Sequence, residues 1–123
     1  MSNKVKMVIV IRKELKCRSG KWVSQGAHAA SQWLINKVNN RSYFDKVEQD
    51  WLANGTTKIC LQVDTEDELM EIYQKALDAD LKVHLVIDEG VTEFKNVHTK
   101  TCLAIGPNLV EDINPITEGL KLF

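Results

Sequence analysis

The sequence predicts an α/β fold: a single three-layer domain over residues 1–123, with helices on both faces of a mixed, mostly parallel sheet of four strands. Segments with strand character alternate along the chain with segments of helical periodicity. The first strand is a continuous run of β-branched residues, which is typical of a strand covered on both faces. The length of 123 residues suits one domain with a substantial core.

The first strand is predicted at residues 6–12, and a long helix follows it. Ser19 is the candidate N-cap of this helix. Apolar residues then recur at helical spacing, and we expect this row to face the sheet. The row consists of Val23, Ala27, Ala30, Leu34 and Val38. A second amphipathic helix is expected over residues 42–52, because Asn54-Gly55 marks a stop.

The rest of the chain supplies three more strands and two more helices. A strand is predicted at 58–63, and Thr65 with Glu68 forms the sequence pattern of a capping box that opens a helix. Further strands are predicted at 83–87 and 101–105, and a short helix at 109–113. The connection between these last two strands is too short for a crossover helix, so we expect the fourth strand to be antiparallel.

The overall composition excludes several classes of protein. With 44% hydrophobic and 27% charged residues, the chain has the composition of a globular protein and not of a disordered one. No apolar run approaches the ~20 residues of a membrane span, so no membrane association is expected. The three cysteines are widely spaced, which favours a reducing cytoplasm without disulfides. The three histidines lack metal-ligand spacing, so neither a metal site nor a cofactor is expected.

Positive charge is concentrated at the start of the chain. Residues 1–21 hold seven Lys and Arg and one acid, although the net charge of the whole chain is −1. This asymmetry indicates a basic patch for an anionic partner, and a solvated basic terminus is an equally good interpretation of the charge alone. Gly20 and Lys21 fall where a helix begins, and free N–H groups, a glycine and a lysine together suit a phosphate.

Polar residues from distant segments are expected to meet at one edge of the sheet. Ligands of open α/β sheets bind beyond the carboxyl ends of the strands. The first strand delivers Lys21 to this edge, the third ends at Asp88, and an antiparallel fourth strand would start there with Thr99 and Thr101. Within the first helix, a polar stripe follows Lys21 at helical spacing. The stripe continues with Gln25, His28 and Gln32.

Several short pieces of sequence, in order from residue 6 to residue 123, form a familiar pattern. They are the strand at 6–12, Leu15-Lys16, Gly20-Lys21, Gln25 with His28-Ala29-Ala30, Lys58-Ile59, Asp88-x-Gly90-x-Thr92-Glu93, Thr99-x-Thr101, Leu103-Ala104-Ile105-Gly106-Pro107 and Gly119-Leu120-Lys121-Leu122-Phe123. In this order and at this spacing, the chain resembles the type II peptidyl-tRNA hydrolases of archaea and eukaryotes.

The resemblance implies an enzyme that hydrolyses the ester joining a peptide to the 3′ ribose of tRNA, without a metal or other cofactor. It also suggests a homodimer. By position, the implied functional residues are Lys16, Lys21, Gln25, Asp88 and Thr99 or Thr101. His28 matches a motif position, and a hydrogen-bonded helix histidine is the alternative interpretation.

The chemistry of ester hydrolysis suggests a role for each group. Asp88 would orient or deprotonate water, and Lys21, with Gln25 or a threonine hydroxyl, would stabilise the oxyanion. An aspartate near its usual pKa of ~3.9 is a poor base at neutral pH, so either a raised pKa or water orientation is required. The residues expected to contact the tRNA backbone are Lys13, Lys16, Arg18 and Gly20.

Three features depart from the family pattern. Glu89 adds a negative charge beside Asp88, Gly26 stands where a cysteine or an apolar residue is common, and the loop 95–98 lacks the usual Pro-Gly. They leave a second hypothesis open: a non-enzymatic module of the same fold that binds RNA or protein through the basic patch.

Overall fold

The computed structural model describes residues 4–90 and 97–123 of the chain. The predicted motif residues Thr92 and Glu93, and part of the loop 95–98, lie outside the described residues. Within the described ranges, four helices accompany five strands. In chain order the elements are β1 (Val5–Arg12), α1 (Ser19–Asn39), α2 (Lys46–Ala53), β2 (Lys58–Val63), α3 (Glu66–Asp78), β3 (Val83–Asp88), β4 (Thr99–Leu109), α4 (Val110–Thr117) and β5 (Lys121–Leu122).

The strands form one mixed sheet in the order β3-β4-β1-β2-β5. Only β1 and β2 pair in parallel; β1 with β4, β3 with β4, and β2 with β5 are antiparallel. The α/β class and the mixed sheet are therefore confirmed, whereas the prediction of four mostly parallel strands is wrong. The reason is that β4 enters the sheet between β1 and β3 and so separates two strands that run the same way. A fifth strand of two residues is too short to give a periodic signal.

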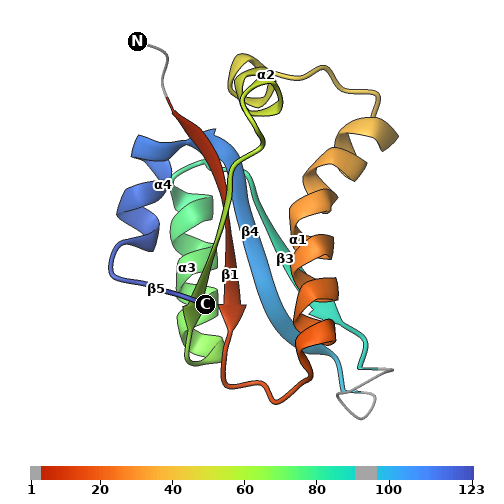
Figure 1. Cartoon of the computed structure of the whole chain (residues 1–123), viewed down its shortest axis with the longest axis vertical. Coiled ribbons are helices and arrows are strands. Elements are labelled where there is room, and N and C mark those ends of the chain that lie inside the picture. Colours follow the sequence, from red (N-terminus) through yellow and green to blue (C-terminus); the bar gives the residue numbers. More distant parts are fainter. Residues whose placement is uncertain (1–3, 91–96) are drawn as a thin grey trace.

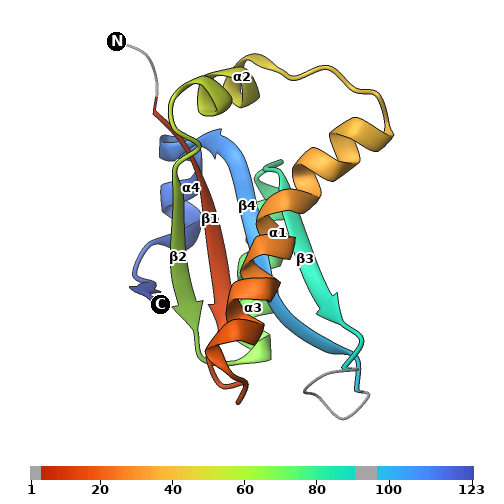
Figure 2. The same cartoon turned by 45° about the vertical axis from the view of Figure 1, so that its right-hand side comes forward.

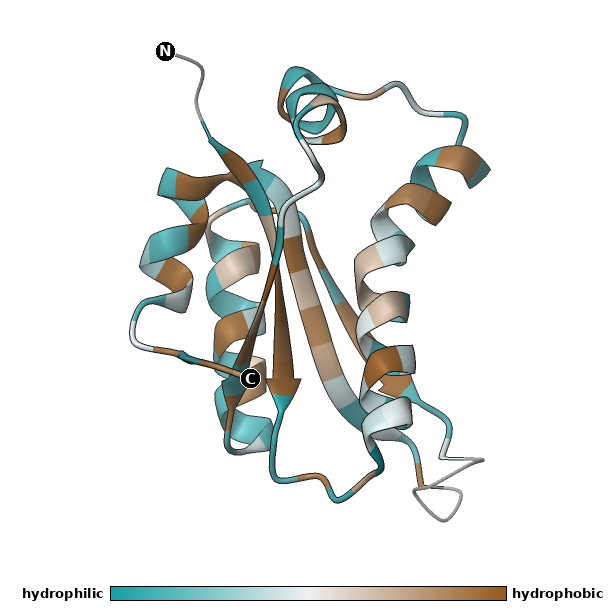
Figure 3. Cartoon of the chain, in the orientation of Figure 1, coloured by the Kyte–Doolittle hydropathy of each residue, from teal (hydrophilic) through white to brown (hydrophobic). Residues whose placement is uncertain are grey.

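Helices cover both faces of this sheet, which gives three layers (Figures 1 and 2). On one face, α3 and α4 bury Leu69, Ile72 and Ile113 against the middle of β1 and β4. On the other face, α1 and α2 bury Ala29 and Trp51. The central strands carry apolar residues along most of their length (Figure 3), as expected for strands buried on both sides. This rigid centre fixes the positions of the strand ends.

The first helix turns a different face to the sheet from the one that its apolar row predicts. Gln25 and Ala29 are the buried residues of α1, while Val23 and Val38 are 72% and 66% exposed. The prediction that this apolar row faces the sheet is therefore wrong: the face that is buried lies about one residue position further round the helix. Trp22 and Trp33 pack against the core beneath α1, and their large side chains outweigh the smaller apolar residues in setting its rotation. An apolar stripe is left on the outside.

The helix starts also differ in part from expectation. Arg18 is the N-cap of α1, without a side-chain cap, so the prediction of Ser19 as cap is wrong. Thr65 does cap α3, because its hydroxyl accepts from the Glu68 N–H at 3.2 Å. A full capping box, not noticed in the sequence, joins Asp45 and Glu48 at the start of α2. None of the helices in the described residues is long and apolar enough to cross a membrane.

The edge predicted to carry the site is formed as expected. Because β4 is antiparallel to both of its neighbours, it begins at the edge where β1 and β3 end. The loop that follows β1 and the first turn of α1 lie at this same edge, at the bottom of Figure 1.

Candidate active site

An ion pair between α1 and β3 lies at the centre of the predicted edge. Lys21 Nζ is 2.9 Å from Asp88 Oδ1, and the two side chains are only 12% and 13% exposed. Lys21 is held by the first turn of α1 and Asp88 by the last position of β3. The sequence analysis placed both residues at this edge of the sheet, and the structure shows them in contact although they are 67 positions apart.

Gln25, one turn further along α1, joins the ion pair to β4. Its amide nitrogen donates to Asp88 Oδ1 at 3.3 Å, and its amide oxygen accepts from the Thr101 hydroxyl at 2.6 Å. A carboxylate can only accept hydrogen bonds, so the nitrogen has to face Asp88 and the oxygen has to face Thr101. Gln25 is buried, and this pairing satisfies both ends of its amide. The network thus fixes the orientation of the Gln25 side chain.

A register shift in the sheet explains how Thr101 reaches α1. Val86 pairs with Cys102, but Ile87 pairs with Lys100, so Thr101 is an extra residue on β4. Such a β-bulge re-aims the side chain at the bulged position. Thr101 and Cys102 consequently both contact Gln25, although strict alternation would send them to opposite faces. Thr101 is fully buried, so its hydroxyl bonds to Gln25 and does not reach solvent.

The surroundings of Asp88 favour its charged form. Burial by itself raises the pKa of Asp88, but the bonds from Lys21, from the Gly90 N–H at 2.8 Å and from Gln25 outweigh it. The pKa of Asp88 is therefore held below its ordinary value of 3.8. Asp88 is a carboxylate at neutral pH, and a weak base. Of the two roles left open by the sequence, this environment favours water orientation over proton abstraction.

The network opens into a hollow between α1 and β3, with a volume of about 470 Å³. His28 and the exposed Glu89 line it together with Lys21, Gln25 and Asp88. His28 lies one turn beyond Gln25 and faces His84 of β3, with ring centroids 6.3 Å apart. Burial first, and then the charge of His28, lowers the pKa of His84, so His84 is neutral at neutral pH. The hollow therefore presents a cation, two carboxylates, an amide and an imidazole.

His84 is a site neighbour that the sequence analysis missed. It alternates with Val86 and Asp88 along β3, and residues two apart on a strand share a face. Once Asp88 is chosen as a site residue, this spacing predicts that His84 lies on the same face of β3.

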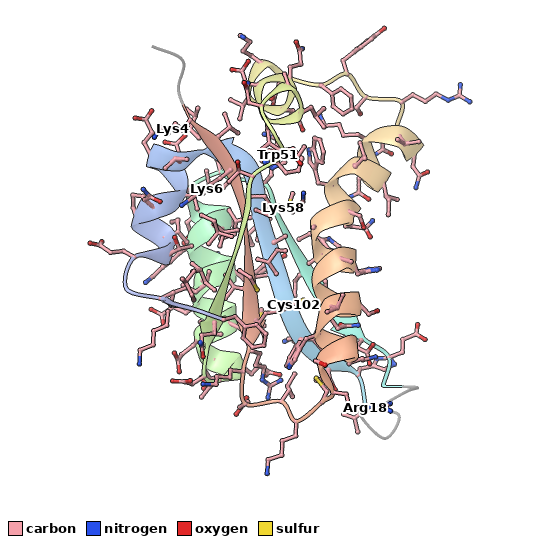
Figure 4. All side chains as sticks on the ribbon, viewed as in Figure 1. Lys4, Lys6, Arg18, Trp51, Lys58 and Cys102 are labelled. Carbon is pink, nitrogen blue, oxygen red and sulfur yellow. The ribbon has the colours of Figure 1, made fainter. Side chains whose placement is uncertain are left out.

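The other predicted residues lie around this centre. Thr99 pairs with Asp88 in the ladder, but its hydroxyl donates to the Val97 carbonyl at 2.8 Å and not to the network. Exposed basic residues and a glycine line the approach from β1 to α1: they are Lys13, Lys16, Arg18 and Gly20. Arg18 lies at the lower end of the molecule in Figure 4, where α1 begins. Across the described ranges, no group of three or more His, Cys, Asp and Glu is arranged to hold a metal.

Comparisons with known proteins point to one family. A family profile described as peptidyl-tRNA hydrolase PTH2 matches residues 5–123. A Sulfurisphaera tokodaii protein named peptidyl-tRNA hydrolase is 38% identical over 118 residues, covering 95% of this chain and 97% of that protein. A Methanocaldococcus jannaschii protein of the same name is 36% identical, with 96% and 99% covered.

Among solved structures, a protein of unknown function from Agrobacterium tumefaciens has a similar fold. Its TM-score is 0.64 at 17% identity, and the superposition covers 100% of this chain and 99% of the other. At this identity the likeness concerns the fold alone.

Proposed function

The chain belongs to the peptidyl-tRNA hydrolase PTH2 family, and from this premise we propose that the Lys21–Asp88–Gln25 network is its catalytic centre. The enzyme hydrolyses the ester between the peptide and the 3′ ribose of peptidyl-tRNA. Water adds to the ester carbonyl, the bond to the 3′ oxygen breaks, and that oxygen takes a proton. The products are tRNA with a free 3′ hydroxyl and a peptide acid, which loses its proton to solvent.

The observation that carries the proposal is the connection of an ion pair to a buried hydroxyl through a single amide, beside an open hollow. Lys21 and Asp88 are 2.9 Å apart and line the hollow, so both can reach a substrate. The groups behind them are fixed by the bond from Thr101 to Gln25. Donors that are held in place before the reaction need no reorganisation when charge develops.

Each residue has one task in this proposal. Asp88 accepts a hydrogen bond from the attacking water and aims its lone pair at the ester carbon. Lys21 donates to the carbonyl oxygen as it becomes negative, and the second N–H of Gln25 supports it. Thr101 is a positioning residue, because it is fully buried and acts through Gln25. His28 lines the same hollow and contacts the substrate there, whereas Thr99 lies outside the network.

The tRNA is held by the basic approach to α1. Lys13, Lys16 and Arg18 are exposed at the edge where the ion pair lies, and lysine or arginine contacts to phosphates are independent of sequence and sensitive to salt. Gly20 lies in the first turn of α1 with no atom within 4 Å of an added Cβ, so a phosphate can approach the backbone there. We place the protein in the cytoplasm, in keeping with three thiols that form no disulfide.

The outer face of α1 supports a homodimer. Val23, Leu34 and Val38 are 72%, 39% and 66% exposed on this helix. Beside them is an apolar hollow of about 520 Å³ between α1 and the α2–β2 segment. A row of exposed apolar side chains next to a hollow marks an association surface. Sedimentation equilibrium should give twice the mass of the 14.0 kDa chain, and Leu34→Glu should shift it towards the monomer.

The function is tested by the release of N-acetyl-phenylalanine from N-acetyl-phenylalanyl-tRNA in EDTA. We expect turnover by the wild type without any metal, and a loss of about 10³-fold in kcat for Asp88→Asn, because the neutral amide orients water poorly. Glu71→Gln is the matched control, since Glu71 lies on α3 beyond the opposite face of the sheet. A folded wild type that binds tRNA at low salt without turnover would favour the non-enzymatic module instead.

A further inference from the structure

A second hollow lies beyond the first, also between α1 and β3. It has a volume of about 330 Å³ and is lined by the C-terminal half of α1, the start of β3 and the chain leading into α2. His28 lines the first hollow and His84 the second, and their rings are 6.3 Å apart. The two hollows therefore lie on either side of the histidine pair, along the same side of α1. We call the two together the groove, which starts at the ion pair.

The groove leads away from the basic approach. The loop between β1 and α1 carries Lys13, Lys16 and Arg18 at the start of α1, whereas the second hollow is lined by the far end of α1 and by Glu48 of α2. The start of α1 and the helix α2 lie at opposite ends of the molecule (Figure 1). A peptidyl-tRNA has two unlike halves on either side of the scissile ester, a polyanion and a peptide. With the ester at Lys21 and the tRNA on the basic approach, the peptide has to leave in another direction.

The charges of the second hollow are balanced, which suits a peptide and not a polyanion. Lys37 is paired with Glu48 at 2.9 Å, and Lys82 with Asp45 at 3.2 Å. His84 adds no charge at neutral pH, because burial and the neighbouring His28 lower its pKa. The other polar groups of the wall are neutral amides and a hydroxyl, which can donate to and accept from any peptide backbone. They are Asn36, Asn40 and Ser42.

We propose that the groove, from Gln25 beside the ion pair to Asn36, is the binding site for the peptide half of the substrate. This inference rests on the proposed function. From Gln25 to Asn36, α1 rises about 16 Å, at about 1.5 Å per residue. An extended peptide covers that length with about five residues, at about 3.3 Å each. The neutral amides bind the peptide backbone without selecting a side chain, as an enzyme acting on unrelated peptides requires.

The experiment compares two substrates on the same tRNA. One carries N-acetyl-phenylalanine, which ends near Lys21, and the other an N-acetylated pentapeptide with the same C-terminal phenylalanine. Asn36→Trp fills the second hollow with a bulky ring. We expect KM for the pentapeptidyl substrate to rise about tenfold, with kcat and the short substrate unchanged. Ser42→Trp fills the same hollow from the other wall, should Asn36→Trp not fold.

Ile35→Trp is the matched control, because Ile35 is on the same helix, is 42% exposed and lines neither hollow. An equal rise in KM for both substrates would place the tRNA in the groove and overturn the inference. No change with either substrate would overturn it as well. Failure of the proposed function is distinct from both, because the wild type would then hydrolyse neither substrate.

Discussion

The first helix carries two lysines that form similar ion pairs in very different surroundings. Lys21 Nζ is 2.9 Å from Asp88 near the start of α1, and Lys37 Nζ is 2.9 Å from Glu48 near its end. Glu48 has no exposed surface, and it also accepts from the Trp33 indole and from the Asp45 backbone N–H. Asp88 keeps 13% of its side chain exposed and lines the hollow next to the basic approach.

In the proposed assignment, the groups around an ion pair, more than the length of the pair, separate a structural pair from one that acts on a substrate. Every bond of Glu48 goes to a group that orders α1 and α2: the Trp33 indole, the Lys37 ammonium and the N-cap of α2. At Asp88, the ion pair is connected through Gln25 to the buried Thr101 hydroxyl, while the hollow leaves a way in for substrate.

The largest expected effect is on stability, at the Lys37–Glu48 pair, whose carboxylate is fully buried. Glu48→Gln leaves the Lys37 ammonium largely buried without its counter-charge, which should lower the free energy of unfolding by about 3–5 kcal/mol. Urea unfolding measures this loss in the free energy of unfolding. Glu71→Gln is the control, because its pair with Lys75 is exposed and such pairs contribute about 0–1 kcal/mol. Equal losses for the two variants would contradict a structural role for Glu48.

The next effect is on catalysis, at Thr101, which holds Gln25 beside the Lys21–Asp88 pair. Thr101→Val keeps the shape of the side chain but removes the hydroxyl bonded to Gln25, so kcat should fall about tenfold as the amide loses its fixed orientation. Thr101→Ser should restore most of the rate, because serine supplies the same donor. A purely structural role for Thr101 would instead leave kcat of the folded valine variant at the wild-type value.

A smaller effect is expected midway between the pairs. Gly26 lies within α1, and an added Cβ would meet no atom within 4 Å. Gly26→Ala should therefore raise the free energy of unfolding by about 0.5–1 kcal/mol, since alanine is the better helix former. The midpoint of thermal unfolding checks it. A lower midpoint would mean that the proposed dimer interface extends over Gly26, which lines the apolar hollow beside the outer face of α1.

The smallest effect concerns pH. The pKa of Asp88 is depressed, so the stability from its charged form is present above the ordinary value of 3.8 and is lost as the pH falls through the lower, folded-state pKa. Between pH 8 and 5, kcat should therefore change less than about twofold on account of Asp88. The profile is repeated with a His28→Gln, His84→Gln double variant, so that neither imidazole beside the site contributes. A steep acid limb that persists near pH 6 would assign Asp88 a raised pKa and a role as base.

Much of the site could be predicted from the sequence because it depends on strand direction. The short connection between residues 88 and 99 required an antiparallel β4, and this brought Asp88 and Thr101 to the edge where α1 begins. The order of the strands could not be predicted in this way. Nothing local to β4 shows that it inserts between β1 and β3, since that choice depends on packing across the whole sheet.

Two further details depend on contacts that are distant in sequence. The rotation of α1, which buries Gln25 and exposes Val23, is set by the tryptophans beneath the helix and by the bond to Thr101. The bulge at Thr101 leaves no mark in the alternation of residues around it. The sequence therefore identified Thr101 as a candidate but could not separate it from Thr99, whose hydroxyl bonds within its own loop.

The central claim, that the pair at Lys21 is catalytic, is tested most directly by kcat of Lys21→Ala for N-acetyl-phenylalanyl-tRNA. Lys75→Ala is measured beside it as a control from an exposed pair on the opposite side of the sheet. We predict a loss of about 100-fold in kcat for Lys21→Ala, because the developing oxyanion loses its charged donor, and no loss for Lys75→Ala. A folded Lys21→Ala protein with kcat within about twofold of the wild type would contradict the account.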